Sequence, residues 1–251
     1  MKVLFCGAHP DDAEIFAFGT LLAWKAAGAD ILLSIACIGD KGSTDRTQGR
    51  NLADVRRAEA EASAALLGAR LDLVGLPDLG VAPGRFRLAN RLQQTILAER
   101  PAVILTHSPN DYHVDHRALA VAVAMAAGED VPVVYVDTFK GADFLPTHFV
   151  DIAPHQERKF EAIRLHKSQK PRRYVLSALE LAGRRGKQAT GDAQRLMEAF
   201  RFDPSPRFRS ARGLFPPGTL AARSIVLPAP NGRVLAAGSY QINLGSPGAK
   251  P

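Results

Sequence analysis

The chain has 251 residues, 46% of them hydrophobic, which is enough apolar sequence for one α/β domain with a substantial core. This composition excludes wholesale disorder, and no apolar run approaches the length needed to cross a bilayer. The two cysteines, Cys6 and Cys37, are too few for a disulfide framework, and we expect both to be buried thiols. The first residues lack the layout of a signal peptide, so we expect a cytoplasmic protein that makes no membrane contact.

Strand-like apolar runs alternate with helical periodicity over the first 136 residues. Strands are predicted at Val3–Gly7, Ile31–Ile38, Leu71–Leu76, Ala102–Thr106 and Val131–Val136. Helices are predicted between them at Ala13–Ala27, Leu52–Leu67, Leu88–Arg100 and Arg117–Ala127. This alternation predicts an α/β fold with a parallel sheet and helices on both faces. Ligands of such sheets bind beyond the carboxyl ends of the strands.

The pattern changes after Phe160. Further helical pieces are predicted at Glu161–His166, Leu176–Arg185 and Ala193–Phe200. Proline, glycine and arginine then dominate, with a strand-like run at Arg223–Leu227, a hairpin at Asn231-Gly232 and a disordered end at Gly245–Pro251. We expect residues 202–251 to be a helical and irregular extension, packed on or near the ligand cleft.

Positive charge is concentrated in one stretch of a chain whose formal net charge is +7. Ten Lys or Arg residues lie between Arg158 and Lys187, against only two Glu. Such a stretch can attract an anionic substrate or a nucleic acid, or it can be a solvated surface. No aromatic residues interleave with the charges as in nucleic-acid-binding segments, so a small-molecule partner is expected and a nucleic acid is not.

Two short motifs combine histidine and aspartate at predicted strand ends. His9-Pro-Asp-Asp12 follows the first strand, and His113-Val-Asp-His116 follows the fourth. Imidazole nitrogen and carboxylate oxygen are the ligands that catalytic zinc accepts, with one position left open for water. A second carboxylate is then needed to take the proton of that water. Because Asp11 and Asp12 are adjacent, one can bind metal while the other faces the water.

These two motifs resemble the signatures of the LmbE/PIG-L family of zinc-dependent N-deacetylases. The resemblance spans roughly residues 1–201 and implies a Rossmann-like deacetylase domain with zinc at the carboxyl edge of the sheet. Further segments share it, namely Gly39-Asp-Lys-Gly-Ser43, Arg56-Arg-Ala-Glu-Ala60, Leu66-Leu-Gly68, Leu76-Pro-Asp78, His166-Lys-Ser-Gln169 and Met197-Glu-Ala-Phe200. Two positions depart from the family pattern: Val114 replaces a usual proline, and Phe16-Ala-Phe-Gly19 replaces a glycine-rich stretch.

The resemblance implies a role for each residue of the two motifs. His9, Asp12 and His116 would bind one Zn²⁺. Asp11 would be the general base that deprotonates the attacking water. His113 would stabilise the oxyanion or protonate the leaving amine, which amide cleavage requires, and Asp115 would orient a histidine.

Three further residues are predicted to contact substrate, each with a structural alternative. Arg56 matches a family position that contacts hydroxyls or phosphate, but it can instead pair with Glu59 one turn along a helix. Asp78 can instead cap a turn, and Tyr112 can simply line its loop. His166 and Gln169 are expected to brace a loop or to lie at the cleft. The remaining histidines, which have no partner motif, are expected to be surface or structural residues: His107, His148 and His155.

The sequence thus predicts a zinc-dependent hydrolase that removes an N-acetyl or other N-acyl group from an amino sugar or sugar conjugate. One alternative is a zinc amidase that acts on a non-sugar N-acyl amine or a thiol conjugate. A more distant alternative is a non-catalytic nucleotide- or nucleic-acid-binding module. It is disfavoured because Gly7-Ala-His-Pro follows the first strand where a phosphate-binding glycine motif would be needed. Assembly into a homo-oligomer is left open.

Overall fold

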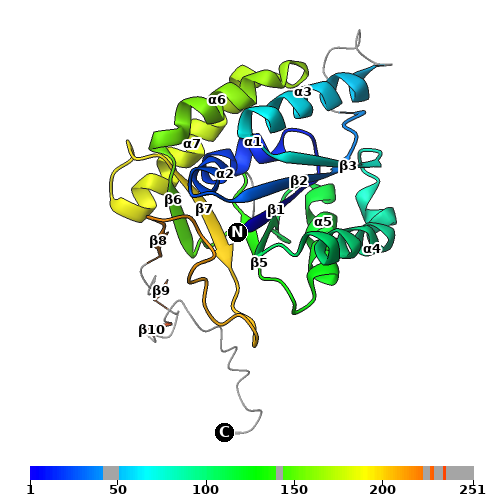
Figure 1. Ribbon diagram of the computed structural model, residues 1–251. Helices are drawn as coiled ribbons and strands as arrows, with labels where there is room; N and C mark the ends of the chain where they lie inside the picture. The colour runs from blue at the N-terminus through cyan, green and yellow to red at the C-terminus, as the bar shows by residue number, and fades with distance from the viewer. Residues whose placement is uncertain (42–50, 140–143, 223–226, 229–233, 236–251) are drawn as a thin grey trace, which may run out of the picture.

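The computed structural model describes residues 1–41, 51–139, 144–222, 227–228 and 234–235. Over those residues eight strands form one sheet, in the order β3-β2-β1-β4-β5-β7-β6-β8 (Figure 1). The strands are β1 (Lys2–Gly7), β2 (Asp30–Cys37), β3 (Arg70–Leu76), β4 (Val103–His107), β5 (Val133–Val136), β6 (His148–Asp151), β7 (Met197–Phe202) and β8 (Leu220–Ala221). The helices are α1 (Asp12–Phe16), α2 (Phe18–Ala26), α3 (Leu52–Leu67), α4 (Val81–Glu99), α5 (Val114–Ala127), α6 (Gln156–Leu165) and α7 (Pro171–Thr190), with short 3₁₀ turns η2 (Ala153–His155) and η3 (Lys167–Gln169).

The first five strands run parallel, and β1 lies between β2 and β4. The side chains of β1 are buried on both faces of the sheet: Val3 and Phe5 pack into one core cluster, and Leu4 and Cys6 into the other. A continuous apolar run is what a strand covered on both faces requires. The sequence signal for this part of the sheet was therefore direct.

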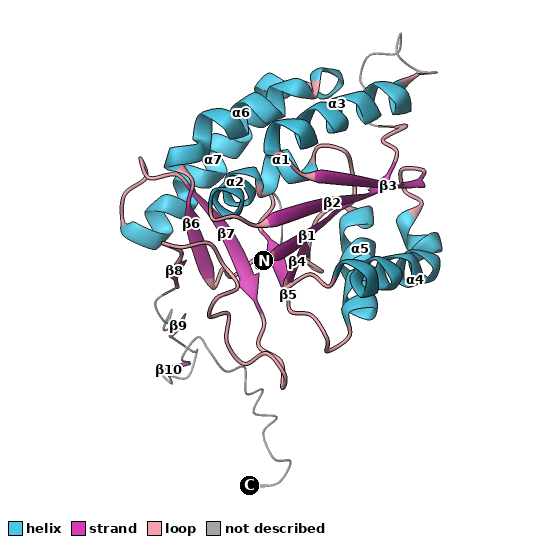
Figure 2. Cartoon of the chain, viewed as in Figure 1, coloured by secondary structure: helices cyan, strands magenta, loops and turns pink. Residues whose placement is uncertain are grey.

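Helices cover both faces of the sheet, which confirms the predicted fold class. Figure 2 shows α4 and α5 on one face and the other five α-helices on the opposite face. Both cysteines are buried free thiols, also as expected. The loops that follow β1, β2, β3 and β4 all lie at one edge of the sheet because these strands are parallel.

One predicted helix is interrupted. The segment Ala13–Ala27 forms two helices, α1 and α2, separated at Ala17, where φ is −140°. The Glu198 carboxylate accepts hydrogen bonds from Gly19 N (3.0 Å) and Thr20 N (2.7 Å), and so satisfies the first amides of α2. Because Glu198 lies 179 residues beyond Gly19, no local periodicity could have indicated this break.

The far side of the sheet differs from the prediction. A helical piece was predicted over Ala193–Phe200, and this is wrong: Met197–Phe202 is strand β7. β7 runs antiparallel to both β5 and β6, so the complete sheet is mixed rather than parallel. Phe200 and Phe202 pack into one core cluster while Met197 and Ala199 pack into another, which is the alternation of a strand covered on both faces. β6 was not predicted at all.

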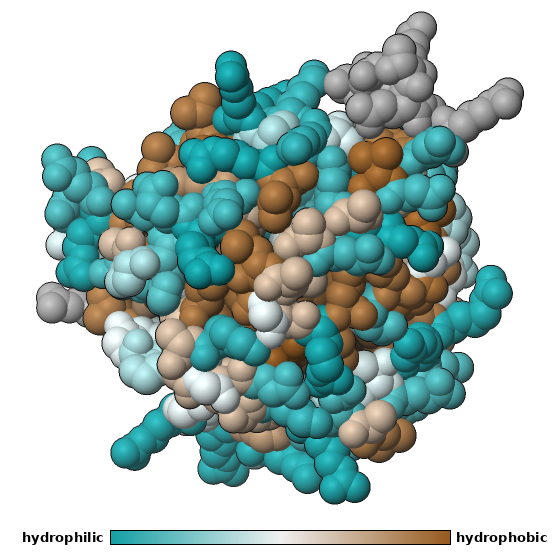
Figure 3. All heavy atoms as spheres, turned by 45° about the horizontal axis from the view of Figure 1, so that its top comes forward, coloured by the Kyte–Doolittle hydropathy of each residue, from teal (hydrophilic) through white to brown (hydrophobic). Residues whose placement is uncertain are grey.

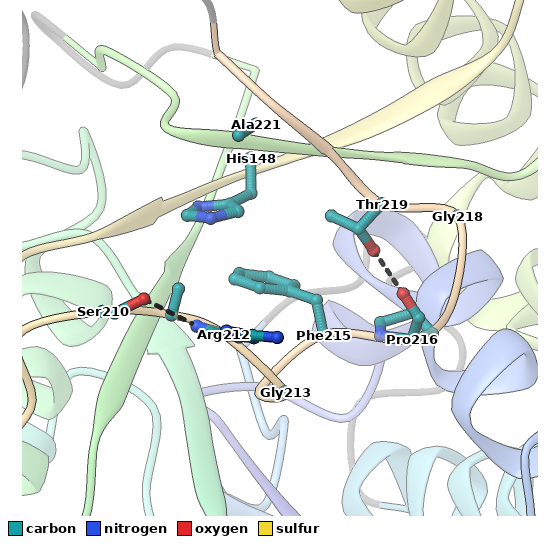
Figure 4. A pocket seen from close by; sticks show the side chains of 10 residues that line it. His148, Ser210, Arg212, Gly213, Phe215, Pro216, Gly218, Thr219 and Ala221 are labelled. Atoms are coloured by element: carbon teal, nitrogen blue, oxygen red, sulfur yellow. Dashed lines mark hydrogen bonds between the residues drawn. The ribbon is translucent and has the colours of Figure 1, made fainter.

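Beyond β7, the chain packs back on the sheet. β8 pairs with β6, and the Phe215 ring stacks on His148 with ring centroids 4.4 Å apart. A cavity of about 370 Å³ opens between His148 and the loop that carries Arg212 and Phe215 (Figure 4). β9 (Leu227–Pro228) and β10 (Val234–Leu235) pair with each other. Most of the strand-like run at 223–227, the Asn231-Gly232 hairpin and the predicted disordered end fall outside the described residues.

The surface is mixed in character. Hydrophobic residues lie among hydrophilic ones on the face shown in Figure 3. Within the basic stretch from Arg158 to Lys187, eight of the ten cations are exposed, Arg185 is partly buried and Lys159 is buried. Among the described residues, no helix is long and apolar enough to span a bilayer.

Candidate metal centre

The two histidine motifs meet at the carboxyl edge of the sheet. His9 follows β1, Asp12 begins α1, and His113 and His116 lie at the start of α5, which follows β4. Because β1 and β4 are paired neighbours in the sheet, these loops are brought together although about 100 residues separate them in sequence. The predicted common location of the two motifs is therefore correct.

The side chains of His9, His116 and Asp12 lie within ion-pair or hydrogen-bond distance of one another. His9 Nδ1 lies 3.3 Å from His116 Nε2, and His116 Nε2 lies 3.3 Å from Asp12 Oδ1. His9 Nδ1 lies 3.7 Å from Asp12 Oδ2. Ligand atoms arranged tetrahedrally around zinc at its usual bond lengths are about 3.3 Å apart. The two distances to His116 Nε2 match this spacing, and the third, which joins His9 Nδ1 to the other oxygen of Asp12, is longer.

Two further carboxylates determine which nitrogens face that position. Asp115 Oδ2 lies 3.3 Å from His9 Nε2, and Asp111 Oδ2 lies 3.0 Å from His116 Nδ1, an ion-pair distance reached without good hydrogen-bond alignment. In the neutral tautomers that carry the proton beside these carboxylates, the lone pairs of His9 Nδ1 and His116 Nε2 would face each other. That arrangement is repulsive by itself and favourable around a cation, as in carboxylate–histidine–zinc triads.

The pKa shifts of these groups indicate that the cluster favours positive charge. Burial lowers the pKa of His116, but Asp12 and Asp111 outweigh burial and raise that pKa to about 10. Burial raises the pKa of Asp12, yet His116 and His107 hold it well below its ordinary value. For His9, burial acts to lower the pKa, whereas the bond to Asp115 and the charge of Asp12 bring it above normal. A divalent cation would supply the positive charge that protons on the histidines supply here.

Asp11 lies beside the ligands without joining them in the contacts described. Its side chain is held by Arg56, whose Nη2 donates to Asp11 Oδ1 at 2.9 Å, and the Arg56 side chain is only 3% exposed. Gly39 makes room for this guanidinium, because a Cβ at Gly39 would lie 2.7 Å from Arg56 Cδ and Nε. Asp11 is thus fixed in direction, as a general base must be.

His113 lies next to the proposed ligands. Its Nδ1 accepts a hydrogen bond from Asp115 N at 3.2 Å, and its ring centroid lies 4.7 Å from that of His9. Burial, together with the positive charges of His9 and His116, lowers the pKa of His113. Its nitrogen is also close enough to those of His9 and His116 to join a metal group. Metal content of a variant therefore decides between ligand and catalytic group.

Two functional residues were missed by the sequence reasoning. His107 was expected to be a surface or structural residue, yet it is fully buried and its Nε2 lies 2.9 Å from Asp12 Oδ2. Its ring stacks on that of His116 at 3.7 Å between centroids. Asp111, which contacts His116, was not singled out either. Both residues belong to the histidine-rich segment after β4, and their position within that segment was the available signal.

The three predicted substrate contacts have protein partners in this structure. Arg56 pairs with Asp11 rather than with Glu59, which accepts hydrogen bonds from Ser168 N and Oγ. Asp78 is 6% exposed, and its carboxylate accepts from Gly39 N and Lys41 N. This geometry matches the alternative that Asp78 braces a turn. Tyr112 is 48% exposed, and its ring lies edge-on to His113 and His116.

Two other groups lie near the site. His166 is buried, with Nε2 3.6 Å from Glu14 Oε2, and neither of its ring nitrogens has a hydrogen-bond partner among the described residues, whereas Glu14 receives a hydrogen bond from Ser63 Oγ. The expected role of His166 in bracing a loop therefore stays a prediction. Cys37 lies within reach of His9 and Asp115, but burial raises the pKa of its thiol and keeps it protonated. The cavity of Figure 4 is separate, because none of the described residues that line it belongs to this cluster.

Fold and site together define an α/β protein with a histidine–aspartate cluster at the sheet edge that could hold a metal ion. Residues 4–127 match the PIG-L family, described as GlcNAc-PI de-N-acetylase. This match contains both motifs, so residues 4–127 form a PIG-L family domain, and deacetylases of that family are metal-dependent.

Individual proteins agree with this assignment. The chain is 28% identical over 196 residues to the diacetylchitobiose deacetylase of Thermococcus kodakarensis, covering 68% of this chain and 70% of the relative. The structure of the N,N′-diacetylchitobiose deacetylase from Pyrococcus horikoshii superposes with a TM-score of 0.67 and 26% identity, covering 81% of this chain and 84% of that one.

A third protein shares the fold but is named for another reaction. The 4-carboxy-2-hydroxymuconate hydratase of Pseudomonas putida KT2440 has a TM-score of 0.71 at 22% identity, covering 81% of this chain and 97% of that one. At that identity the likeness concerns the fold alone.

Proposed function

We propose that this protein is a zinc-dependent deacetylase that hydrolyses the N-acetyl group of an amino sugar or amino-sugar conjugate. The observation that carries the proposal is the meeting of His9 Nδ1, His116 Nε2 and Asp12 at about tetrahedral spacing, with Asp11 beside them. The deacetylase relatives support the reaction, and the chitobiose in their names supports an amino sugar as substrate.

Each residue has a chemical task in this proposal. His9, Asp12 and His116 hold the metal, and a bound zinc ion supplies Lewis acidity and lowers the pKa of water to about 7. Asp11 takes the proton of the attacking water. His113 stabilises charge on the carbonyl oxygen or returns a proton to the leaving amine, because an amide nitrogen leaves only when protonated.

The remaining carboxylates orient these groups. Asp115 contacts His9 Nε2 and accepts a hydrogen bond from Leu79 N at 2.7 Å. The loop after β3 therefore fixes the direction of the Asp115 carboxylate. Asp111 Oδ2 lies 3.0 Å from His116 Nδ1, and Asp111 Oδ1 accepts a hydrogen bond from His113 N at 2.9 Å. Such supporting contacts typically change metal affinity or activity by about 10- to 100-fold.

A product assay tests the proposed reaction. Purified protein with zinc supplied is incubated with N-acetylglucosamine, diacetylchitobiose, N-acetylglucosaminyl conjugates and an N-acetylated thiol conjugate, and free amine and acetate are both measured. We expect equal amounts of amine and acetate from amino sugars, and no products after chelation until zinc is returned. Products from the thiol conjugate alone would replace this proposal by the amidase alternative. Metal-free protein that hydrolyses the sugars would contradict it.

The basic stretch from Arg158 to Lys187 suggests a second comparison in this assay, between neutral and anionic substrates. Arg173 and Tyr174 lie in the first turn of α7, and the Tyr174 ring stacks on Phe139, which packs against Phe16 beside His116. Exposed cations here would concentrate anionic substrates, with an effect that salt screens. Equal kcat/KM for neutral and anionic N-acetylglucosamine derivatives at all ionic strengths would leave the stretch as a solvated surface. Cytoplasmic location and absence of nucleic-acid binding stay predictions, and homo-oligomer formation stays open.

A further inference from the structure

Leu79 has an unusual backbone conformation. Its φ is +67°, a left-handed value that a residue with a Cβ adopts at an energetic cost. Among the described residues, two other non-glycine residues share a positive φ, Arg100 and Lys170. Both flank helices, at the C-terminus of α4 and the N-terminus of α7, where the chain changes direction. Leu79 also precedes a helix, just before the N-cap Gly80 of α4, but it lies in the short loop after β3 at the edge of the candidate metal centre, where Asp115 binds its amide.

The surrounding loop fixes Leu79 in place. Its N–H donates to Asp115 Oδ2 at 2.7 Å, and Val81 N lies 3.3 Å from Asp115 Oδ1. Gly80 N donates to Pro77 O, and a Cβ at Gly80 would lie only 2.7 Å from that same oxygen. The glycine of this turn is therefore required at position 80, and the left-handed conformation falls on the leucine before it.

The Leu79 side chain is not explained by packing. It is 54% exposed, although leucine in this conformation costs more than glycine or asparagine would. Asp115, which binds the Leu79 amide, also contacts His9 Nε2, so Leu79 stands within two contacts of a proposed ligand. Two other apolar side chains at this site are also well exposed, Tyr112 at 48% and Val114 at 40%.

From this juxtaposition we infer that Leu79 is a specificity-determining contact for an apolar group on the substrate. The inference rests on the proposed function and names one property of its substrate. A partly exposed leucine beside a polar centre gains free energy when an apolar group removes it from water. That group is either the aglycone of the amino sugar or an acyl chain longer than acetyl, and these two sources can be tested separately.

Two substitutions remove the leucine while they suit the backbone. Leu79→Asn and Leu79→Gly both tolerate a positive φ and keep the N–H that binds Asp115. Leu97→Asn is the matched control, since Leu97 is 69% exposed near the opposite end of α4 from the site. For each protein, kcat/KM is measured with N-acetylglucosamine, an aryl or alkyl N-acetylglucosaminide, and N-butanoylglucosamine. Zinc content and thermal midpoint are measured alongside.

The expected result is a loss confined to apolar substrates. Both Leu79 variants should lose about five- to tenfold in kcat/KM on the glycosides, on the N-butanoyl compound, or on both, and should change less than about twofold on N-acetylglucosamine. The affected substrate identifies the apolar group as aglycone or acyl chain. Zinc content should stay close to wild type, the thermal midpoint should not fall because both new residues accept a positive φ at lower cost, and Leu97→Asn should leave all rates unchanged. An equal change on all three substrates would overturn the inference while deacetylation stands, whereas no hydrolysis by wild-type protein would reject the proposed function itself.

Discussion

Two buried polar clusters lie on either end of helix α1, and they are satisfied in opposite ways. At its C-terminal end, Lys159 Nζ donates to Ile15 O and to Glu198 Oε1, both at 2.7 Å. Glu198 in turn accepts the Gly19 and Thr20 amides, so one cation meets one anion and every contact is made within the protein. We refer to Lys159 and Glu198 as the α1–α2 latch.

At the N-terminal end of α1, the charges do not balance. Four aspartates gather around the histidines, and Arg56 is the arginine that pairs with one of them. His107 Nδ1, His116 Nδ1 and Asp111 Oδ2 are buried without a hydrogen-bond partner. A buried polar cluster that lacks partners is costly unless something supplies them. The latch is therefore satisfied by the protein itself, whereas the histidine cluster has unpartnered polar atoms that a cation from outside would satisfy.

Removing a ligand should break the histidine cluster most severely. His116→Ala deletes the nitrogen that lies 3.3 Å from both His9 Nδ1 and Asp12 Oδ1, so we expect zinc to be lost and activity to fall by at least about 10³-fold. Zinc per protein by elemental analysis and amine release measure the two effects. A variant that retained one zinc per chain would show that His116 is not a ligand.

Substituting the proposed base should separate chemistry from metal binding. Asp11→Asn keeps an oxygen for Arg56 Nη2 to bind but cannot accept a proton, so we expect zinc to remain and kcat to fall by about 10²–10⁴-fold. The control is zinc content of the same preparation. If zinc were lost instead, Asp11 and Asp12 would exchange their roles, and near-normal turnover would exclude Asp11 from both.

The sequence predicted the cluster whose residues lie in short local motifs and missed the one whose residues are far apart in the chain. The histidine cluster was predictable because His9-Pro-Asp-Asp12 and His113-Val-Asp-His116 are local motifs at the ends of strands whose apolar runs are unambiguous. The latch was not, since it joins α1, α6 and β7 through residues far apart in sequence, and neither Lys159 nor Glu198 belongs to a pattern that indicates a partner.

The same reasoning explains the errors in the fold. The helix predicted at Ala193–Phe200 overlaps the first four residues of β7. Four of the six residues of β7 are apolar, namely Met197, Ala199, Phe200 and Phe202, and such a run suits a buried helix as well as a strand. Pairing with β5 and β6 decides between the two, and pairing is a tertiary property. His107 was underestimated for a similar reason: its partner Asp12 lies on another strand end, 95 residues away.

A smaller effect is expected at His113. His113→Ala removes an imidazole that we place beside the metal rather than on it, so kcat should fall by about 10²–10³-fold while zinc content stays unchanged. Loss of zinc together with activity would make His113 a fourth protein ligand. That outcome would extend the charge-deficient cluster by one residue and leave oxyanion stabilisation to another group.

The smallest effect on turnover is expected in the latch. Lys159→Met leaves Glu198 as a buried anion without its cation, and breaking a buried pair in this way typically costs about 3–5 kcal/mol of stability. Urea unfolding should show this loss, while below the unfolding transition zinc content stays at one per chain and kcat changes by no more than a few-fold. Lys159→Met combined with Glu198→Gln should recover part of the stability, because the glutamine can still accept one α2 amide and no unpaired charge remains. If the single variant lost zinc with its stability intact, the latch would be part of the metal centre, and the distinction between a complete cluster and a cation-seeking one would no longer hold.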